Sequence, residues 1–99
     1  MEIDFDALRP QLAGLCRKYG IAELAVFGSA ARGELRPQSD VDILYVRASG
    51  NDLGMHYFDL QDELSSLFGR PVDLVPKEGL HWIVRDEVLA EARELAAPV

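Results

Sequence analysis

Apolar residues recur along this chain at helical spacing in three segments, which are residues 6–19, 55–68 and 81–96. The first helix is expected to begin at Asp6 as N-cap or, because Pro10 fits only a first turn, at Arg9. Glycines follow the first two segments and supply their stop signals. Trp82 is expected to pack the last helix on a sheet. The inward face of that helix is predicted to consist of Val84, Val88, Ala92 and Leu95.

Three short apolar runs, at residues 24–27, 41–46 and 72–75, predict strands. Between the first two, residues 29–33 can form one helical turn with Ser29 as its N-cap. Residues 48–54 are expected to form a loop. Helices and strands then alternate as αβαβαβα, an α/β (α+β) chain. We expect a small mixed three-stranded sheet flanked by helices.

The connections between the runs constrain this sheet. A full helix joins the second and third strands, which is the connection that a parallel right-handed crossover needs. If residues 28–29 and the acidic pair at 40–42 share a site, the end of the first strand meets the start of the second. Those two strands are then antiparallel neighbours.

Composition narrows the class of protein. The 99 residues, 48% of them hydrophobic, predict one globular domain over residues 1–99. Apolar stretches are too short to span a membrane and the acidic N-terminus lacks the basic region of a signal peptide, so a cytoplasmic location is expected. The single cysteine, Cys16, excludes an internal disulfide and falls on an apolar helix face, which predicts a core residue.

Charge narrows the class of partner. Lys and Arg number 10 against 17 acidic residues, for a net charge of −7. A domain that grips a nucleic-acid backbone usually has a basic face, so direct nucleic-acid binding is disfavoured. An acidic surface suits a cation or a basic protein partner. Self-association into a homo-oligomer through exposed helix faces stays open.

Two aspartates open the second strand. Asp40 and Asp42 project from the same face of a strand, whereas Val41 points to the other. Neighbouring carboxylates either share a proton or bind a cation, and Mg²⁺ prefers such hard oxygen ligands together with phosphate oxygens and water. In the alternative interpretation, Asp40 caps a turn and Asp42 is merely an exposed strand residue.

A third aspartate favours the cation. Asp73 lies in a strand otherwise suited to burial, where an acidic residue is disfavoured unless it is paired or bound to metal. In a parallel neighbour of the second strand, Asp73 comes level with Asp40 and Asp42. Three convergent carboxylates predict a divalent-metal site of the kind used for in-line displacement at phosphorus.

Gly28 and Ser29 supply the complementary half of such a site. Glycine lets a ligand approach the backbone closely, a short helix after it points N–H groups outward, and Ser29 adds a hydroxyl. The pair ends the first strand and lies ten residues before the Asp-x-Asp. This spacing favours phosphate and metal held side by side.

Gly-Ser, ten intervening residues and Asp-x-Asp resemble the signature of the polymerase-β-like nucleotidyltransferase superfamily. Residues 27–29 (Phe-Gly-Ser), 31–33 (Ala-Arg-Gly) and 39–42 (Ser-Asp-Val-Asp) resemble its minimal nucleotidyltransferase (MNT) branch in particular. The resemblance covers nearly the whole chain. One departure is Ala30, where family members often carry a basic residue, and this departure is expected to weaken triphosphate binding. Arg32 is retained, as a phosphate or partner contact or as a solvated side chain.

The resemblance implies a set of roles for these residues. Gly28 and Ser29, with Arg32, would hold the triphosphate of ATP. Asp40 and Asp42 would bind two Mg²⁺ ions, and Asp73 would complete the metal site and help deprotonate the acceptor hydroxyl.

The resemblance also implies an antitoxin of a type VII-like toxin–antitoxin pair. The chain would transfer AMP from ATP to a tyrosine of a HEPN-domain ribonuclease toxin, and its acidic surface suits a basic, RNA-cleaving partner. Two alternatives stay open, a binding-only antitoxin that occludes its partner and nucleotidyl transfer to a small-molecule hydroxyl. The three retained aspartates favour an enzyme over the binding-only alternative. Small-molecule transfer usually needs an additional acceptor-binding domain.

Overall fold

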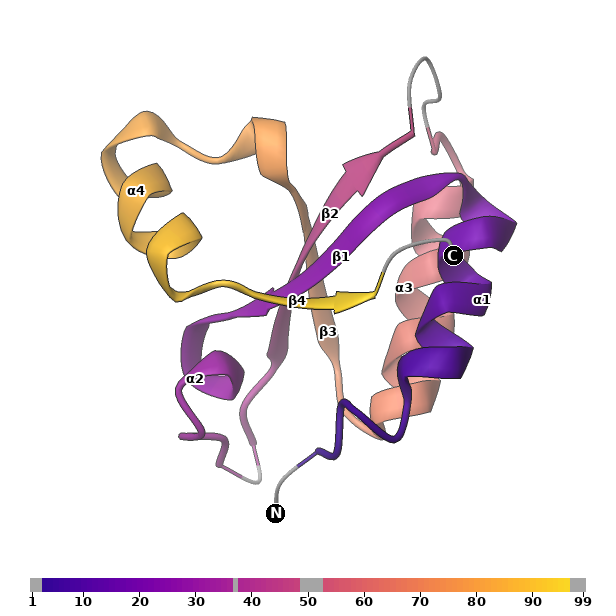
Figure 1. Ribbon diagram of the computed structural model, residues 1–99, viewed down its shortest axis with the longest axis horizontal. Coiled ribbons are helices and arrows are strands. Elements are labelled where there is room, and N and C mark those ends of the chain that lie inside the picture. The colour runs from indigo at the N-terminus through magenta and orange to yellow at the C-terminus, as the bar shows by residue number, and fades with distance from the viewer. Residues whose placement is uncertain (1–2, 37, 49–52, 97–99) are drawn as a thin grey trace.

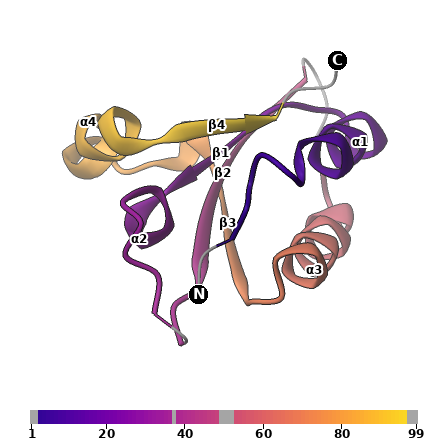
Figure 2. The same ribbon diagram turned by 60° about the horizontal axis from the view of Figure 1, so that its bottom comes forward.

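A computed structural model describes residues 3–36, 38–48 and 53–96 of the chain. Four strands form one sheet in the order β3-β2-β1-β4. Their bounds are Ile21–Phe27 for β1, Val41–Arg47 for β2, Val72–Pro76 for β3 and Arg93–Ala96 for β4. Helices lie on both faces of this sheet, α1 and α3 on one side and α2 and α4 on the other (Figures 1 and 2).

The predicted pairing of the first three strands is confirmed. β1 and β2 are antiparallel, and Phe27 at the end of β1 lies opposite Asp42 near the start of β2. β2 and β3 are parallel, as the helical connection between them required. β1 begins at Ile21, earlier than the predicted residue 24, because the preceding residue Gly20 ends α1 with a left-handed backbone.

The helices begin close to the predicted positions, but their caps differ. Helix α1 runs Arg9–Tyr19 with Pro10 in its first turn, and Asp6 does not cap it. Instead, the Asp6 carboxylate accepts a hydrogen bond from Arg9 Nε at 3.1 Å. The prediction of Ser29 as an N-cap is wrong, because helix α2 already begins at Gly28 and spans Gly28–Ala31. Helix α3 spans His56–Phe68, and residues 49–52 of the predicted loop lie outside the described residues.

The last predicted helix is too long, and the sheet has four strands rather than three. Helix α4 spans Trp82–Glu91, and β4 then pairs antiparallel with β1. The physical reason is the edge of β1, whose backbone N–H and C=O groups need partners that a strand supplies and a helix does not. Leu95 is buried as predicted, but from this strand.

Most of the hydrophobic core lies between the sheet and the helices α1 and α3, and Ala30 of α2 also belongs to it. Its fully buried members include Leu12 and Cys16 of α1, and Leu60 and Leu64 of α3. Cys16 is fully buried, which confirms the prediction of a core cysteine, and this burial raises the pKa of its thiol to about 11. The part of the chain that the structure describes contains no helix long and apolar enough to cross a membrane.

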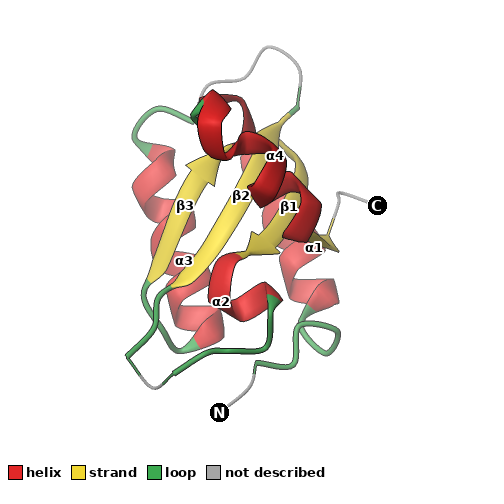
Figure 3. Cartoon of the chain, turned by 90° about the vertical axis from the view of Figure 1, so that its left-hand side faces the viewer, coloured by secondary structure: helices red, strands yellow, loops and turns green. Residues whose placement is uncertain are grey.

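Helix α4 lies on the opposite face of the sheet and is mostly exposed (Figure 3). It packs on α2 and β1 through its second half, where Val88 and Leu89 are half-buried. Trp82 is 78% exposed and Val84 42%, so the expected packing of both on the sheet is wrong. The chain reaches the start of α4 from β3 through a 3₁₀ turn at Lys77–Gly79 and an extended Leu80.

Candidate active site

Gly28 lies directly against Asp42 at the end of β1. A Cβ atom added to Gly28 would lie 2.4 Å from Asp42 Oδ2, and the Gly28 φ of +68° is in the left-handed region. Position 28 therefore excludes a side chain both by backbone conformation and by space. The sequence prediction that the Gly-Ser pair meets the aspartates is confirmed at this contact.

Asp42 and Asp73 are direct partners across the parallel pair β2 and β3. Burial raises the pKa of the Asp42 carboxyl, and the negative charges of Asp73 and then Asp40 raise it further. The Arg32 guanidinium opposes this shift, and Glu91 adds to it. The carboxylates that the sequence singled out thus lie close enough to repel one another.

Asp73 itself is exposed, although its strand is otherwise suited to burial. Its neighbours Val72 and Leu74 face the core, with 5% and 2% exposure. Strand alternation therefore turns Asp73 to the face that carries Asp42, on the edge strand of the sheet. The acidic residue is explained by an open site rather than by a buried one.

The aspartates do not form a preassembled metal cage. Within residues 3–36, 38–48 and 53–96, no three His, Cys, Asp or Glu side chains converge closely enough to hold a metal ion. Their chemistry nevertheless fits Mg²⁺, which typically takes one or two carboxylates and completes its shell with phosphate oxygens and water. The carboxylates around Asp42 would provide such ligands if a cation offsets their mutual repulsion.

The short helix α2 places the remaining predicted residues. Ser29 follows Gly28 in its single turn and is half-buried. Ala30 is 7% exposed and belongs to the hydrophobic core cluster, so its side chain points away from solvent. The small residue at this position is therefore explained by packing.

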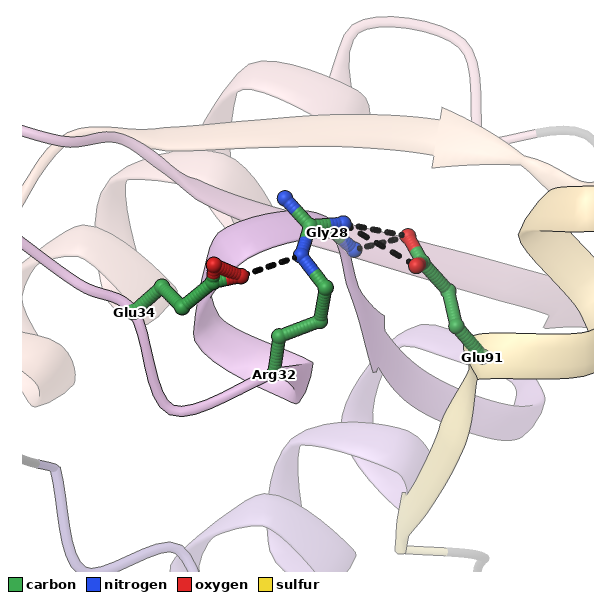
Figure 4. Close-up of polar contacts among 4 residues, drawn as sticks. All are labelled: Gly28, Arg32, Glu34 and Glu91. Atoms are coloured by element: carbon green, nitrogen blue, oxygen red, sulfur yellow. Dashed lines mark hydrogen bonds and ion pairs between the residues drawn. The ribbon is translucent and has the colours of Figure 1, made fainter.

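Arg32 is held by two carboxylates, neither of which the sequence reasoning identified (Figure 4). Its Nε donates to Glu34 Oε1 at 2.7 Å, and its Nη1 donates to Glu91 Oε2 at 3.0 Å. Glu91 Oε1 also accepts from the backbone N–H of Gly28 at 2.9 Å. Glu91 is thus a site residue, which its place near the end of a predicted amphipathic helix did not signal.

The two histidines lie at the starts of different helices. His81 caps α4, where its Nδ1 accepts from the backbone N–H of Ile83 at 3.2 Å. His56 is exposed at the start of α3, with Nδ1 3.5 Å from Asp59 Oδ2. Tyr45 is buried, and the Tyr57 hydroxyl donates to the Leu74 carbonyl at 2.5 Å, so both tyrosines take part in packing.

Comparison with known sequences matches residues 8–95 to the sequence model of the nucleotidyltransferase domain. The protein adenylyltransferase MntA of Thermococcus cleftensis is 39% identical over 77 residues, which cover 78% of this chain and 77% of MntA. MJ0128 of Methanocaldococcus jannaschii, assigned as a protein adenylyltransferase, is 43% identical over 72 residues, covering 73% and 72% of the two chains.

Two solved structures share the fold. One, assigned as a minimal nucleotidyltransferase, is 37% identical with a TM-score of 0.79, and the match covers 94% of this chain and 95% of that one. The other, a complex of an MNT antitoxin with a tri-AMPylated HEPN toxin of Shewanella oneidensis, has a TM-score of 0.65 over 92% of this chain and 71% of the matched one. At 20% identity the second likeness shows the fold alone. The chain therefore belongs to the nucleotidyltransferase domain family and, within it, to the minimal nucleotidyltransferases, whose relatives include protein adenylyltransferases.

Proposed function

We propose that this chain is the antitoxin of a toxin–antitoxin pair and transfers AMP from ATP to a tyrosine of a HEPN-domain ribonuclease toxin, with Mg²⁺. The observation that carries the proposal is the contact of Gly28 with Asp42, beside the pair formed by Asp42 and Asp73. The protein adenylyltransferase relatives support the reaction class. A fold neighbour described as a toxin–antitoxin complex with AMP-PNP supports ATP as the nucleotide.

In this proposal one half of the site binds the triphosphate and the other half binds the metal. Gly28 and Ser29 hold the triphosphate, where the glycine leaves room for it to approach the backbone, and Arg32 adds positive charge. Asp40, Asp42 and Asp73 would supply carboxylate ligands to two Mg²⁺ ions, and phosphate oxygens and water would complete the coordination. The metal would stabilise the charge on the attacking and leaving oxygens.

The reaction forms one bond and breaks one. The tyrosine oxygen bonds to the α-phosphorus of ATP, the bond to the β-phosphate oxygen breaks, and pyrophosphate leaves. The hydroxyl proton passes to a nearby base, for which Asp73 is the candidate. Its exposed position on the edge strand β3 leaves it accessible to a side chain of another protein.

The charge of the chain supports a protein acceptor of opposite sign. With a net charge of −7, the chain is complementary to a protein that binds and cleaves RNA, and such complementarity speeds encounter and selects partners.

The test is co-expression of the chain with its HEPN partner, followed by mass spectrometry of the partner. The wild-type chain should add one or more AMP groups to a tyrosine, and Asp42→Asn should add none while keeping its fold. Asp62→Asn, an exposed change on α3, is the matched control and should leave the modification intact. Undiminished AMP incorporation by Asp42→Asn would refute the mechanism, and a tight complex with unmodified toxin would indicate a binding-only antitoxin.

A further inference from the structure

The carboxylate of Glu91, at the end of α4, contacts Gly28 and Arg32 of the candidate active site. Glu91 is the last residue of α4, and it accepts the Gly28 N–H at 2.9 Å and two contacts from Arg32 Nη1 at 3.0 and 3.2 Å (Figure 4). Its side chain is 31% exposed. The contact therefore lies at the solvent boundary, within reach of a competing anion.

The donors that hold Glu91 are those expected to attract a phosphate. A backbone N–H and a guanidinium both form short, charge-assisted hydrogen bonds with anionic oxygens, whether these belong to a carboxylate or to a phosphate. One N–H group cannot make a full hydrogen bond to both anions at once. A negative charge at Glu91 also repels a triphosphate placed at Gly28.

We propose that Glu91 is an internal competitor for the nucleotide phosphates, and that nucleotide binding displaces it and loosens α4 from α2. This inference rests on the proposed function, because it takes Gly28 and Arg32 as the phosphate contacts. It adds a regulatory contact to them, because the chain's own carboxylate takes the donors that the phosphates need. Displacement leaves Arg32 paired with Glu34 and turns its other edge toward the nucleotide.

Helix α4 is attached in a way that suits such a release. Its first turn is exposed, with Trp82 at 78% and Ile83 at 64%, whereas burial is confined to its second half. The Glu91 contacts therefore fasten the helix at the end where it meets α2. Without them, the helix stays attached through half-buried Val88 and Leu89 and through β4, which follows it and pairs with β1.

The first experiment measures the Kd of a non-hydrolysable ATP analogue with Mg²⁺ for the wild-type chain and three variants. Glu91→Gln keeps the shape of the side chain and removes its charge, so it should bind about three- to tenfold more tightly. Glu87→Gln, one turn earlier on α4, removes the same charge at an exposed position and should bind like the wild type. Glu34→Gln removes the other partner of Arg32 without touching Gly28 and should tighten binding less than Glu91→Gln.

The outcomes separate this inference from the proposed function. If the wild type binds the analogue and Glu91→Gln binds no more tightly, or Glu34→Gln tightens binding equally, Glu91 is not the competitor. If none of the four proteins binds it, the proposed function fails and the inference with it.

Hydrogen exchange on the wild-type chain tests the release without any variant. Adding the analogue should accelerate amide exchange in residues 82–91, because the contact that fastens α4 is lost. Unchanged or slower exchange there, with the analogue bound, would overturn the proposal.

Discussion

Replacing Gly28 with alanine should damage the candidate active site in a way that the same change at Gly33 does not. Both glycines have a left-handed backbone, with φ values of +68° and +70°. Placing a Cβ atom in that conformation costs about 1–2 kcal/mol. Both variants should therefore unfold at a lower temperature, by about 4–8 °C for each kcal/mol in a chain of this size.

The two variants differ in what the new methyl group meets. At Gly33 nothing lies within 4 Å of the added Cβ, whereas at Gly28 it lies 2.4 Å from Asp42 Oδ2 and 3.3 Å from Asp42 Cγ. Ordinary contact begins near 3.4 Å, so the Asp42 carboxylate has to move by about 1 Å, a displacement that costs about 100-fold in rate at a reacting centre.

The assay is the rate of AMP transfer to the HEPN partner, measured for both variants beside their thermal unfolding. Gly28→Ala should be about 100-fold slower than Gly33→Ala at a temperature where both are folded. Equal rates for the two variants would refute the reasoning, because the backbone cost is shared and only the contact with Asp42 differs.

Three further predictions concern the fold. The Cys16 thiol has an ordinary pKa of 9.0 and a folded pKa of about 11, so the thiol ionises at lower pH in the unfolded chain than in the folded one. As the pH rises from 9 to 11, the wild type should therefore lose about 2–3 kcal/mol of its free energy of unfolding. Denaturant titrations of Cys16→Ala should not show this loss. Leu95→Ala should destabilise the chain by about 2–4 kcal/mol and Val84→Ala by less than about 1 kcal/mol, because only Leu95 is buried. Equal losses would instead support the predicted helix over residues 81–96, with both side chains facing inward. Trp82, the single tryptophan, should be quenched by acrylamide in the folded chain nearly as fully as in denaturant, and strong protection would contradict its exposed position.

The sequence predicted well those parts of the fold in which the pattern of strands and helices agrees with the hypothesis of one shared phosphate and metal site. The hypothesis that Gly28 and Asp42 share a site predicted that the first two strands meet, and the helix between the second and third strands predicted a parallel crossover; both pairings are confirmed. Together these constraints brought Asp73 beside Asp42. The metal and phosphate roles of these residues stay predictions, since their arrangement leaves the metal site incomplete without further ligands.

The parts that the sequence did not reveal depend on contacts between distant segments. Residues 93–96 have strong helix formers, but the open edge of β1 draws them into a strand. The contact between Glu91 and Gly28 spans 63 positions, and no local pattern marks it. Ala30 looked like a missing phosphate contact in a one-dimensional motif, whereas the turn of α2 directs it into the core.

AMP transfer from ATP to the partner is tested most directly with ATP that carries a label in one of its phosphates. Purified chain, Mg²⁺ and the HEPN partner are incubated with ATP labelled either in the α-phosphate or in the γ-phosphate. The account predicts that α-label becomes attached to a tyrosine of the partner, that γ-label leaves with pyrophosphate, and that Asp42→Asn transfers neither. Transfer of γ-label, or transfer of α-label by Asp42→Asn at the wild-type rate, would contradict it.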